Sequence, residues 1–260
     1  MNYKKIIRNQ DLRFKILHFL RFIPDKVMVS IQYRIKLGRY PNLKSPQRYT
    51  EKLQWYKLYY RTELMTQCSD KYLVRKYVES KGLGNILNKL YAVYDSVDEI
   101  NIDLLPDKFV MKTTNGSGTN YICTDKAKLN LDVIKKEFSK WLKRDIYSSG
   151  REWSYKNIKP RIIVEELLED GSNTFSGIND YKFFCFNGKP KYVVLDVDRY
   201  VDHKRNIYDI DWSYMDVFYE YPKLGDVIKK PEGFEEMVRV ANILCEDFPC
   251  VRVDLYWVNH

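Results

Sequence analysis

The spacing of apolar residues changes once along the chain, near Asp107, and this change restricts the folds that the sequence can adopt. Before Asp107 apolar residues recur at helical spacing; after it, short apolar runs separated by turn residues predominate, with two amphipathic helices among them. The runs at residues 180–186 and 189–198 flank Asn187 and Gly188, a strong signal for a tight type I′ hairpin. The sequence therefore predicts an α+β protein.

The chain has 260 residues, enough to bury a sizeable core in one large domain or in two closely packed ones. By pattern we divide it into residues 1–45, a basic helical segment, residues 46–106, a helical or mixed part, and residues 107–260, a strand-rich domain. No apolar run approaches the roughly 20 residues that a membrane span needs. We therefore expect a folded protein without a transmembrane helix.

The cysteines and histidines limit the compartment and the chemistry. There are five cysteines, an odd number with no CxxC pair, and only three histidines. This usage favours a reducing cytoplasm and argues against a disulfide framework or a zinc site. No histidine lies in a pattern that pairs it with a serine or cysteine nucleophile. We therefore expect a cytoplasmic protein whose chemistry does not use a catalytic triad.

The net charge of +9 is concentrated near the N-terminus. Before Tyr40 only Asp11 and Asp25 oppose ten basic residues, which are Lys4, Lys5, Arg8, Arg13, Lys15, Arg21, Lys26, Arg34, Lys36 and Arg39. This excess fits an anionic partner, although a solvated helix face is the plain alternative. The lack of a recognised motif argues against nucleic acid. We expect the segment to dock on the anionic inner face of the membrane through these charges and the interleaved apolar residues.

The segment 109–123, FVMKTTNGSGTNYIC, places Lys112 at the edge of a glycine-containing loop between two apolar runs. It is not a P-loop, because a strand rather than a helix follows the glycines. A hairpin loop can still cover phosphates with backbone N–H groups and hydroxyls, and a lysine can supply a point charge. The two readings, a plain mobile turn and a phosphate-covering loop, both stay open at this point.

Acidic residues lie at the ends of several predicted strands. Glu165, Glu166, Glu169 and Asp170 follow one apolar run, where they could bind a ligand amine, a hydroxyl or a cation, or could simply face water. Asp180 and Lys182 are two residues apart on a predicted strand and therefore share a face. Exposed alternating charges would explain this second pair equally well.

Two further patterns suggest metal binding. Arg252 and Asp254 share a face of an otherwise apolar strand, where a carboxylate needs a partner or a metal ion. Pairing of Asp254 with an arginine is the alternative. Asp196 and Asp198 form a DVD sequence after an apolar run, which could hold the divalent metal of a glycosyltransferase or be an ordinary acidic strand end.

Five motifs in chain order resemble the ATP-grasp superfamily: DKYLVR, FVMKTTNGSG, RIIVEELLED, DYKFFCFNGKPKYV and VRVDLY. The wording of TEKLQWYKLYYR, GREWSYKNIKPRIIVEE and DYKFFCFNGK is similar to the TupA-like branch, which is associated with bacterial surface polysaccharide and teichuronopeptide synthesis. The resemblance extends from about Gly38 onward. It implies an ATP-grasp-like fold in which two antiparallel-sheet subdomains sandwich the nucleotide.

The resemblance also implies site residues. The cofactor-binding set would be Lys112 on the α- and β-phosphates, Asn115, Gly116, Ser117 and Gly118 as the lid, Glu165 and Glu166 beside the adenine, Asp180 near the ribose, and Arg75 near the position of a phosphate-binding lysine. Arg252 would be the catalytic arginine and Asp254 a magnesium ligand. The implied cofactors are ATP and Mg²⁺.

The implied activity is ATP-dependent ligation of a carboxylate to an amine or thiol in cell-surface polysaccharide or capsule synthesis, with a carboxylate or sugar polymer as substrate. The sequence stops six residues after Asp254, before the Glu-containing segment that supplies further magnesium ligands in relatives. We therefore expect residues 107–260 to form an incomplete ATP-grasp-like domain that binds nucleotide with little turnover. The alternatives are a glycosyltransferase that uses Asp196 and Asp198, and a catalytically inactive nucleotide-binding remnant.

Overall fold

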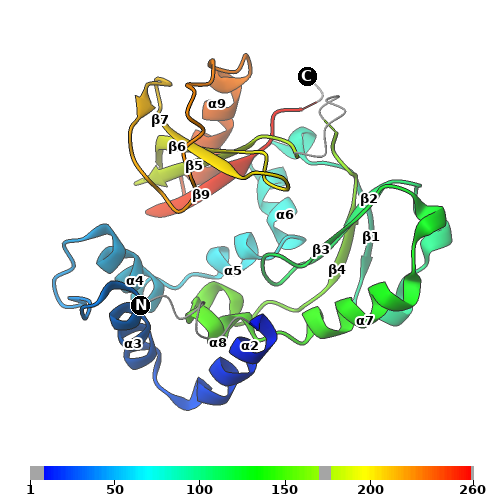
Figure 1. Cartoon of the computed structure of the whole chain (residues 1–260), viewed down its shortest axis with the longest axis horizontal. Coiled ribbons are helices and arrows are strands. Elements are labelled where there is room, and N and C mark those ends of the chain that lie inside the picture. Colours follow the sequence, from blue (N-terminus) through cyan, green and yellow to red (C-terminus); the bar gives the residue numbers. More distant parts are fainter. Residues whose placement is uncertain (1–8, 170–176, 259–260) are drawn as a thin grey trace. The chain divides into compact units, whose positions relative to one another are not determined.

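The structure is a computed structural model that describes residues 9–169 and 177–258. The chain forms two compact units, one comprising the described residues of Met1–Tyr77 and Asn88–Leu167, the other those of Val78–Leu87 and Leu168–His260. Each unit contains one antiparallel sheet with helices (Figure 1). The predicted α+β class is therefore confirmed, and so is the helical N-terminal segment.

The first unit begins with helices and continues into a four-stranded sheet. Its helical elements are α2 (Gln10–Phe19), η1 (Leu20–Phe22), α3 (Asp25–Leu37), α4 (Tyr49–Tyr59), α5 (Glu63–Ser69), α7 (Leu131–Leu142) and α8 (Ile146–Gly150), and α6 (Leu73–Ser80) starts in it and ends in the second unit. The sheet order is β1 (Leu90–Tyr94), β4 (Ile162–Glu165), β2 (Phe109–Thr113), β3 (Asn120–Cys123). The short 3₁₀ turns η3 (Val97–Glu99), η4 (Ile102–Leu104), η5 (Lys126–Lys128) and η6 (Trp153–Tyr155) connect these elements.

Helix α7 covers one face of this sheet and thereby decides which side chains of β2 and β4 are free to form a site (Figure 1). Phe138 and Ile134 of α7 are buried against Phe109 and Met111 of β2. Because side chains alternate along a strand, Lys112 lies on the other face. Glu165 pairs in register with Val110, so its side chain lies on the same face as Lys112.

The second unit is a five-stranded sheet with one helix packed on it. The strand order is β8 (Tyr214–Met215), β7 (Lys204–Asp209), β6 (Lys189–Val197), β5 (Asp180–Phe186), β9 (Cys250–Leu255), and all neighbours are antiparallel. The helix is α9 (Phe234–Cys245), and η2 (Gly84–Ile86) also belongs to this unit. Phe234 of α9 lies 6.0 Å from Phe183 of β5, ring centroid to centroid.

Several local predictions are confirmed. Asn187 and Gly188 have φ values of 49° and 69°, as the predicted type I′ hairpin between β5 and β6 requires. The helical spacing of Val27, Ile31 and Ile35 predicts a helix that closes near Gly38, and Gly38 ends α3 in the left-handed conformation, with φ of 75°. The spacing of apolar residues predicts that the late helix buries Phe234, Val238, Ala241, Cys245 and Phe248. In the structure Val238 of α9 is only partly buried, whereas Met237 and Val240 are buried. The helix buries a broad stripe, and Val238 lies at its edge.

Candidate functional site

Glu165, at the end of β4, is shared by two cations of the first unit. Lys112 Nζ on β2 donates to Glu165 Oε2 at 2.9 Å, and Arg75 Nη1 on α6 donates to Oε1 at 3.2 Å. Arg75 also donates to the side chain and the carbonyl of Asn88, at 3.0 and 2.7 Å. The structure therefore brings together three residues that the resemblance predicts for the nucleotide site, although they are 37 to 90 residues apart in the sequence.

Lys71 is a third cation of this cluster, and the sequence reading did not assign it a role. Its Nζ donates to the carbonyl of Thr113 at 2.9 Å and to the carbonyl of Gly116. Burial, and then the nearby charge of Lys112, lower the pKa of Lys71 to about 8. A signal was available, because Lys71 belongs to the same DKYLVR motif as Arg75, four residues earlier.

The cluster carries a surplus of positive charge. Lys71, Arg75 and Lys112 face the single carboxylate of Glu165. Asp70 also lies beside Lys71, but its Oδ1 accepts from two backbone N–H groups and its Oδ2 lies 3.8 Å from Arg161 Nη1. Among the described residues, two positive charges of this cluster therefore have no counter-ion of their own, an arrangement that complements a polyphosphate.

The glycine-rich loop between β2 and β3 is held at its base and exposed at its tip. Thr113 N donates to the carbonyl of Thr119 at 3.1 Å, and the hydroxyls of these two threonines are 2.7 Å apart. Ser117 and Gly118 at the tip are exposed. Gly116 has φ of 146°, and a Cβ there would lie 3.1 Å from the side chain of Ile146. The loop therefore needs glycine at this position both for its backbone and for its packing.

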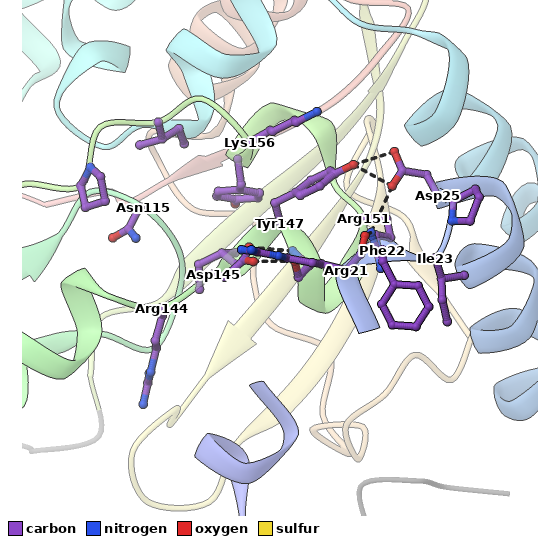
Figure 2. A pocket seen from close by; sticks show the side chains of 16 residues that line it. Arg21, Phe22, Ile23, Asp25, Asn115, Arg144, Asp145, Tyr147, Arg151 and Lys156 are labelled. Atoms are coloured by element: carbon purple, nitrogen blue, oxygen red, sulfur yellow. Dashed lines mark hydrogen bonds and ion pairs between the residues drawn. The ribbon is translucent and has the colours of Figure 1, made fainter. Parts of the chain in front are cut away.

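Asn115 and Glu166 border this cluster in different ways. Asn115 is buried, its Oδ1 has no hydrogen-bond partner among the described residues, and it lines a cavity of the first unit (Figure 2). Glu166 continues β4, and its backbone N–H donates to the carbonyl of Lys89 at 2.9 Å. The structure thus places Asn115 at the loop base and Glu166 at the strand end next to Glu165.

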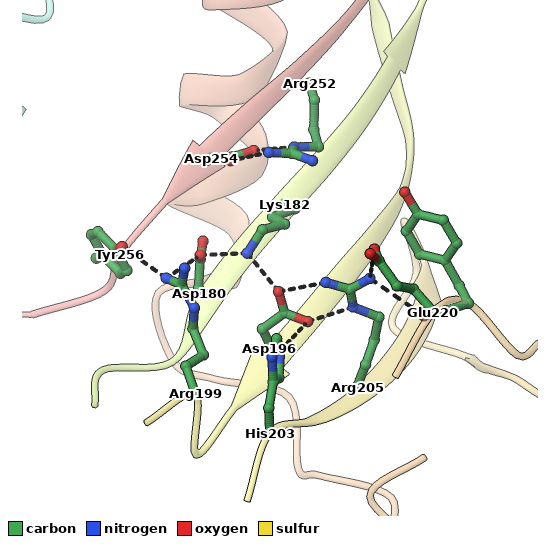
Figure 3. A network of polar contacts seen from close by, with 11 residues as sticks. Asp180, Lys182, Asp196, Arg199, His203, Arg205, Glu220, Arg252, Asp254 and Tyr256 are labelled. Atoms are coloured by element: carbon green, nitrogen blue, oxygen red, sulfur yellow. Dashed lines mark hydrogen bonds and ion pairs between the residues drawn. The ribbon is translucent and has the colours of Figure 1, made fainter. Parts of the chain in front are cut away.

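The second unit holds a buried ion network on the sheet face opposite α9 (Figure 3). Asp196 of β6 receives hydrogen bonds from Arg205 of β7, with Nη2 to Oδ2 at 2.8 Å, and Lys182 Nζ lies 2.7 Å from Oδ2. Lys182 also binds Asp180, to which Arg199 Nη1 donates at 2.7 Å. Burial alone would raise the pKa of Asp196, but the hydrogen bonds from Arg205 and Lys182 hold it well below its usual range.

This network answers the question raised by the DVD sequence. The carboxylate of Asp196 is 2% exposed and is engaged by Arg205 and Lys182. Asp198 occupies a turn with φ of 50°. The carboxylate of Asp196 is therefore occupied by protein cations, so the two acids do not form the pair of free metal ligands that a metal-dependent glycosyltransferase requires, and the geometry favours the acidic strand-end interpretation.

Arg252 and Asp254 on β9 bind each other. Arg252 Nε lies 2.7 Å from Asp254 Oδ1, and Nη2 lies 2.7 Å from Oδ2, a bidentate pair that is partly exposed (Figure 3). The described residues contain no group of three or more His, Cys, Asp or Glu side chains that could hold a metal ion. Mg²⁺ usually takes only one or two protein carboxylates and completes its octahedron with phosphates and water. Asp254 fits that pattern only together with a nucleotide.

The chain has an α+β fold with two antiparallel sheets, and Lys112 on β2 lies beside a glycine-rich hairpin loop. These are features of the ATP-grasp class. The chain belongs to the TupA-like ATP-grasp family, whose family model matches residues 51–260. No curated protein sequence matches it. The described residues contain no helix long and apolar enough to cross a membrane.

Solved structures of ATP-grasp ligases are similar to the chain. D-alanine–D-alanine ligase from Bacillus anthracis complexed with ATP is 15% identical with a TM-score of 0.42, and the match covers 73% of this chain and 49% of that one. ATP-grasp ligase PsnB complexed with minimal precursor, Mg and ADP is 11% identical with a TM-score of 0.38, covering 80% and 53%. The chain therefore spans about half the length of these ligases.

Proposed function

We propose that the protein binds ATP through the cation cluster around Glu165 and uses it to ligate a carboxylate to an amine or thiol. The observation that carries this proposal is the surplus of two positive charges formed by Lys71, Arg75 and Lys112 beside a glycine-rich loop. Ammonium and guanidinium donors form strong charge-assisted hydrogen bonds to phosphate oxygens. The cluster thus supplies the recognition that a nucleoside triphosphate needs.

In this proposal the phosphates replace Glu165 as the main partner of Lys112. The ammonium group needs little movement, since it is already on the open face of the sheet and partly exposed. Lys71 holds the loop base through the carbonyls of Thr113 and Gly116. The exposed tip at Ser117 and Gly118 can then supply backbone N–H groups to the phosphates.

The catalytic step would be phosphoryl transfer to a substrate carboxylate, followed by displacement of phosphate by the amine or thiol. Positioning and charge neutralisation dominate such transfers. Bound Mg²⁺ would neutralise charge on the β- and γ-phosphates. Asp254 would be its protein ligand, Arg252 the catalytic arginine, and Asp180 and Glu166 further nucleotide contacts. A role in cell-surface polysaccharide or capsule synthesis is a proposal that rests on family association alone.

The test is calorimetric titration of ATP into the wild type and the Lys112→Ala variant. Losing one charged hydrogen-bond donor should weaken ATP binding by about 1.5–3 kcal/mol. Lys128→Ala is the matched control, because Lys128 is 83% exposed in the same unit and its ion-pair partner in the described part of the chain is its neighbour Asp125. Equal ATP affinity in Lys112→Ala and wild type would contradict the proposal. Release of ADP in the presence of carboxylate and amine pairs would establish turnover.

We also propose that α2 and η1 dock on an anionic membrane surface. Leu12, Ile16 and Phe19 form a stripe on α2 that is 36–75% exposed, and Phe22 of η1 is 73% exposed. By contrast, Phe14 faces the protein, with Arg144 over its ring. Part of the apolar face of α2 is therefore exposed to solvent instead of packed against the protein. Such a stripe beside basic residues favours an interfacial helix.

Liposome flotation with anionic and neutral vesicles tests this docking. Each basic residue near an anionic surface contributes about 1 kcal/mol, so binding should require anionic lipid and fall with added salt. Phe19→Ala should reduce it, whereas Leu104→Ala should not, although Leu104 is 80% exposed in the same unit. Equal flotation with neutral vesicles, or none with either kind, would rule the docking out.

A further inference from the structure

A cavity of about 680 Å³ lies within the first unit, beside the base of the glycine-rich loop (Figure 2). Four parts of the chain line it: residues 21–25, Asn115, residues 144–151 and residues within 155–160. The cavity therefore combines the N-terminal helices, the α8 region and one residue of the loop that is proposed to cover phosphates. Its volume is in the usual range for a small-molecule site.

The carboxylates in the cavity wall are already satisfied by the protein. Asp25 accepts from the Tyr147 hydroxyl at 2.6 Å and lies 3.4 Å from Arg151 Nη1. Asp145 accepts from the backbone N–H of Ser148 at 2.9 Å and lies 2.8 Å from His18 Nδ1. Neither acid is therefore free to hold a ligand cation.

Two donors and one acceptor of residues that line the cavity have no hydrogen-bond partner among the described residues. Buried Nε atoms of Arg144 and Arg151, and buried Oδ1 of Asn115, make no hydrogen bond to any described residue. The side chain of Arg151 is 2% exposed, and Asn115 is 5% exposed. Leaving such groups unpaired costs free energy, so these three atoms indicate a missing polar partner.

Two cations at the rim strengthen the positive character of the cavity. Neither Arg21 nor Lys156 has a carboxylate within ion-pair distance in the part of the chain that the structure describes, and Lys156 lies 5.4 Å above the ring of Tyr147. Arg144 pairs with Asp11 at 2.9 Å and Arg151 lies 3.4 Å from Asp25, so among the described residues Arg21 and Lys156 are the wall cations that remain for a ligand. Two cations without a carboxylate partner, together with the unpaired oxygen of Asn115, favour a ligand that carries both a negative charge and a hydrogen-bond donor.

We propose that this cavity binds a small organic carboxylate that also carries a hydroxyl or amino group. The cations and the unpaired N–H donors receive the carboxylate, and the unpaired oxygen of Asn115 receives the hydroxyl or amine. Because Asn115 belongs to the glycine-rich loop, the bound acid is the carboxylate that the ligase activates, and this second statement rests on the proposed function.

The test measures binding by ligand-observed NMR titration. The probes are D-gluconate and L-threonine, their matched compounds without a carboxylate, sorbitol and L-threoninamide, and inorganic phosphate. At least one acid should bind saturably while its matched compound does not. Lys156→Ala and Arg21→Ala should each weaken that binding about tenfold or more. The matched control is Lys159→Ala, because Lys159 is 59% exposed, lies three residues from Lys156 and pairs with Asp95.

The outcomes separate this inference from the proposed function. Binding of neither acid, equal binding of an acid and its matched compound, or phosphate binding at least as tight as both acids would overturn the carboxylate assignment. ATP titration of the same wild-type protein is independent of these results. If the protein binds ATP but neither acid, the cavity proposal alone is refuted. If it binds an acid but not ATP, the ligase proposal is refuted and the carboxylate site in the cavity is retained.

Discussion

The two ion clusters of the protein contrast in charge balance. Around Asp196 in the second unit, three cations meet three carboxylates, since Glu220 lies 3.4 Å from Arg205 and completes the set. Around Glu165 in the first unit, three cations meet one carboxylate. The Asp196 cluster is balanced in charge, whereas the Glu165 cluster has a surplus of positive charge.

This difference separates a structural role from a binding role. Charges that are removed from water are tolerated only when they are paired and hydrogen-bonded. The carboxylate of Asp196 meets that condition without a ligand, whereas Oδ1 of Asp180 at the edge of the network is buried without a hydrogen-bond partner among the described residues. The Glu165 cluster does not meet it, and the lowered pKa of Lys71 reflects the cost of burial and of the neighbouring Lys112. Surplus charge beside a glycine-rich loop therefore indicates a ligand site.

The largest expected effect on stability comes from breaking the charge-balanced network around Asp196. Asp196→Ala would leave Arg205 and Lys182 buried without their carboxylate, which should reduce the free energy of unfolding by about 3–5 kcal/mol. Urea denaturation measures this loss. Asp216→Ala is the matched control, since Asp216 is 79% exposed and its contacts with Lys223 and Tyr214 lie at the surface, so it should show little change. Similar small losses in both variants would refute the structural role of Asp196.

A smaller effect is expected from titrating the open cluster. Lys71 has a pKa of about 8 instead of 10.5, so its positive charge is lost as the pH rises through about 8. If Lys71 contributes to phosphate binding, ATP affinity should fall above that pH, by up to about tenfold for one charged contact. Lys71→Arg should abolish the fall, because a guanidinium stays charged. An identical pH profile in both proteins would exclude Lys71.

The same pKa shift of Lys71 predicts that stability and ATP affinity change in opposite directions as the pH rises. Because the folded-state pKa of Lys71 lies below the unfolded value, the charged form destabilises the folded state at neutral pH. That cost is relieved between about pH 8 and 10.5, so the contribution of Lys71 to stability rises over this range while ATP affinity falls. Denaturation and titration on the same samples therefore provide two independent readouts.

The smallest stability effect is expected at the exposed pair on β9. Asp254→Asn removes an ion pair in which Asp254 is 40% exposed, and such surface pairs contribute only about 0.2–1 kcal/mol. Under the proposed function, however, the variant should lose much of the magnesium dependence of ATP binding. Calorimetry with and without Mg²⁺ measures this. Unchanged magnesium dependence would remove Asp254 from the metal site, and a large loss of stability would make its role structural.

Several features of the fold could be predicted from the sequence because they depend on the conformational preferences of a few neighbouring residues. The Asn-Gly dipeptide set the hairpin between β5 and β6, and Gly38 ended α3, because both depend on left-handed backbone that glycine adopts easily. The alternation of β2 placed Lys112 on the opposite face from Met111. These features need information from only a few neighbouring residues.

Only the tertiary structure decided which distant charges meet. Arg75 binds Glu165, which lies 90 residues later in the sequence. Arg205 binds Asp196 from the next strand, so the first acid of the DVD sequence belongs to a buried ion network and not to a metal site. The periodicity of α2 likewise predicted an apolar stripe but not that it would be exposed. Periodicity defines the faces of a helix or strand, but the partner of each face depends on packing between segments that no local pattern encodes.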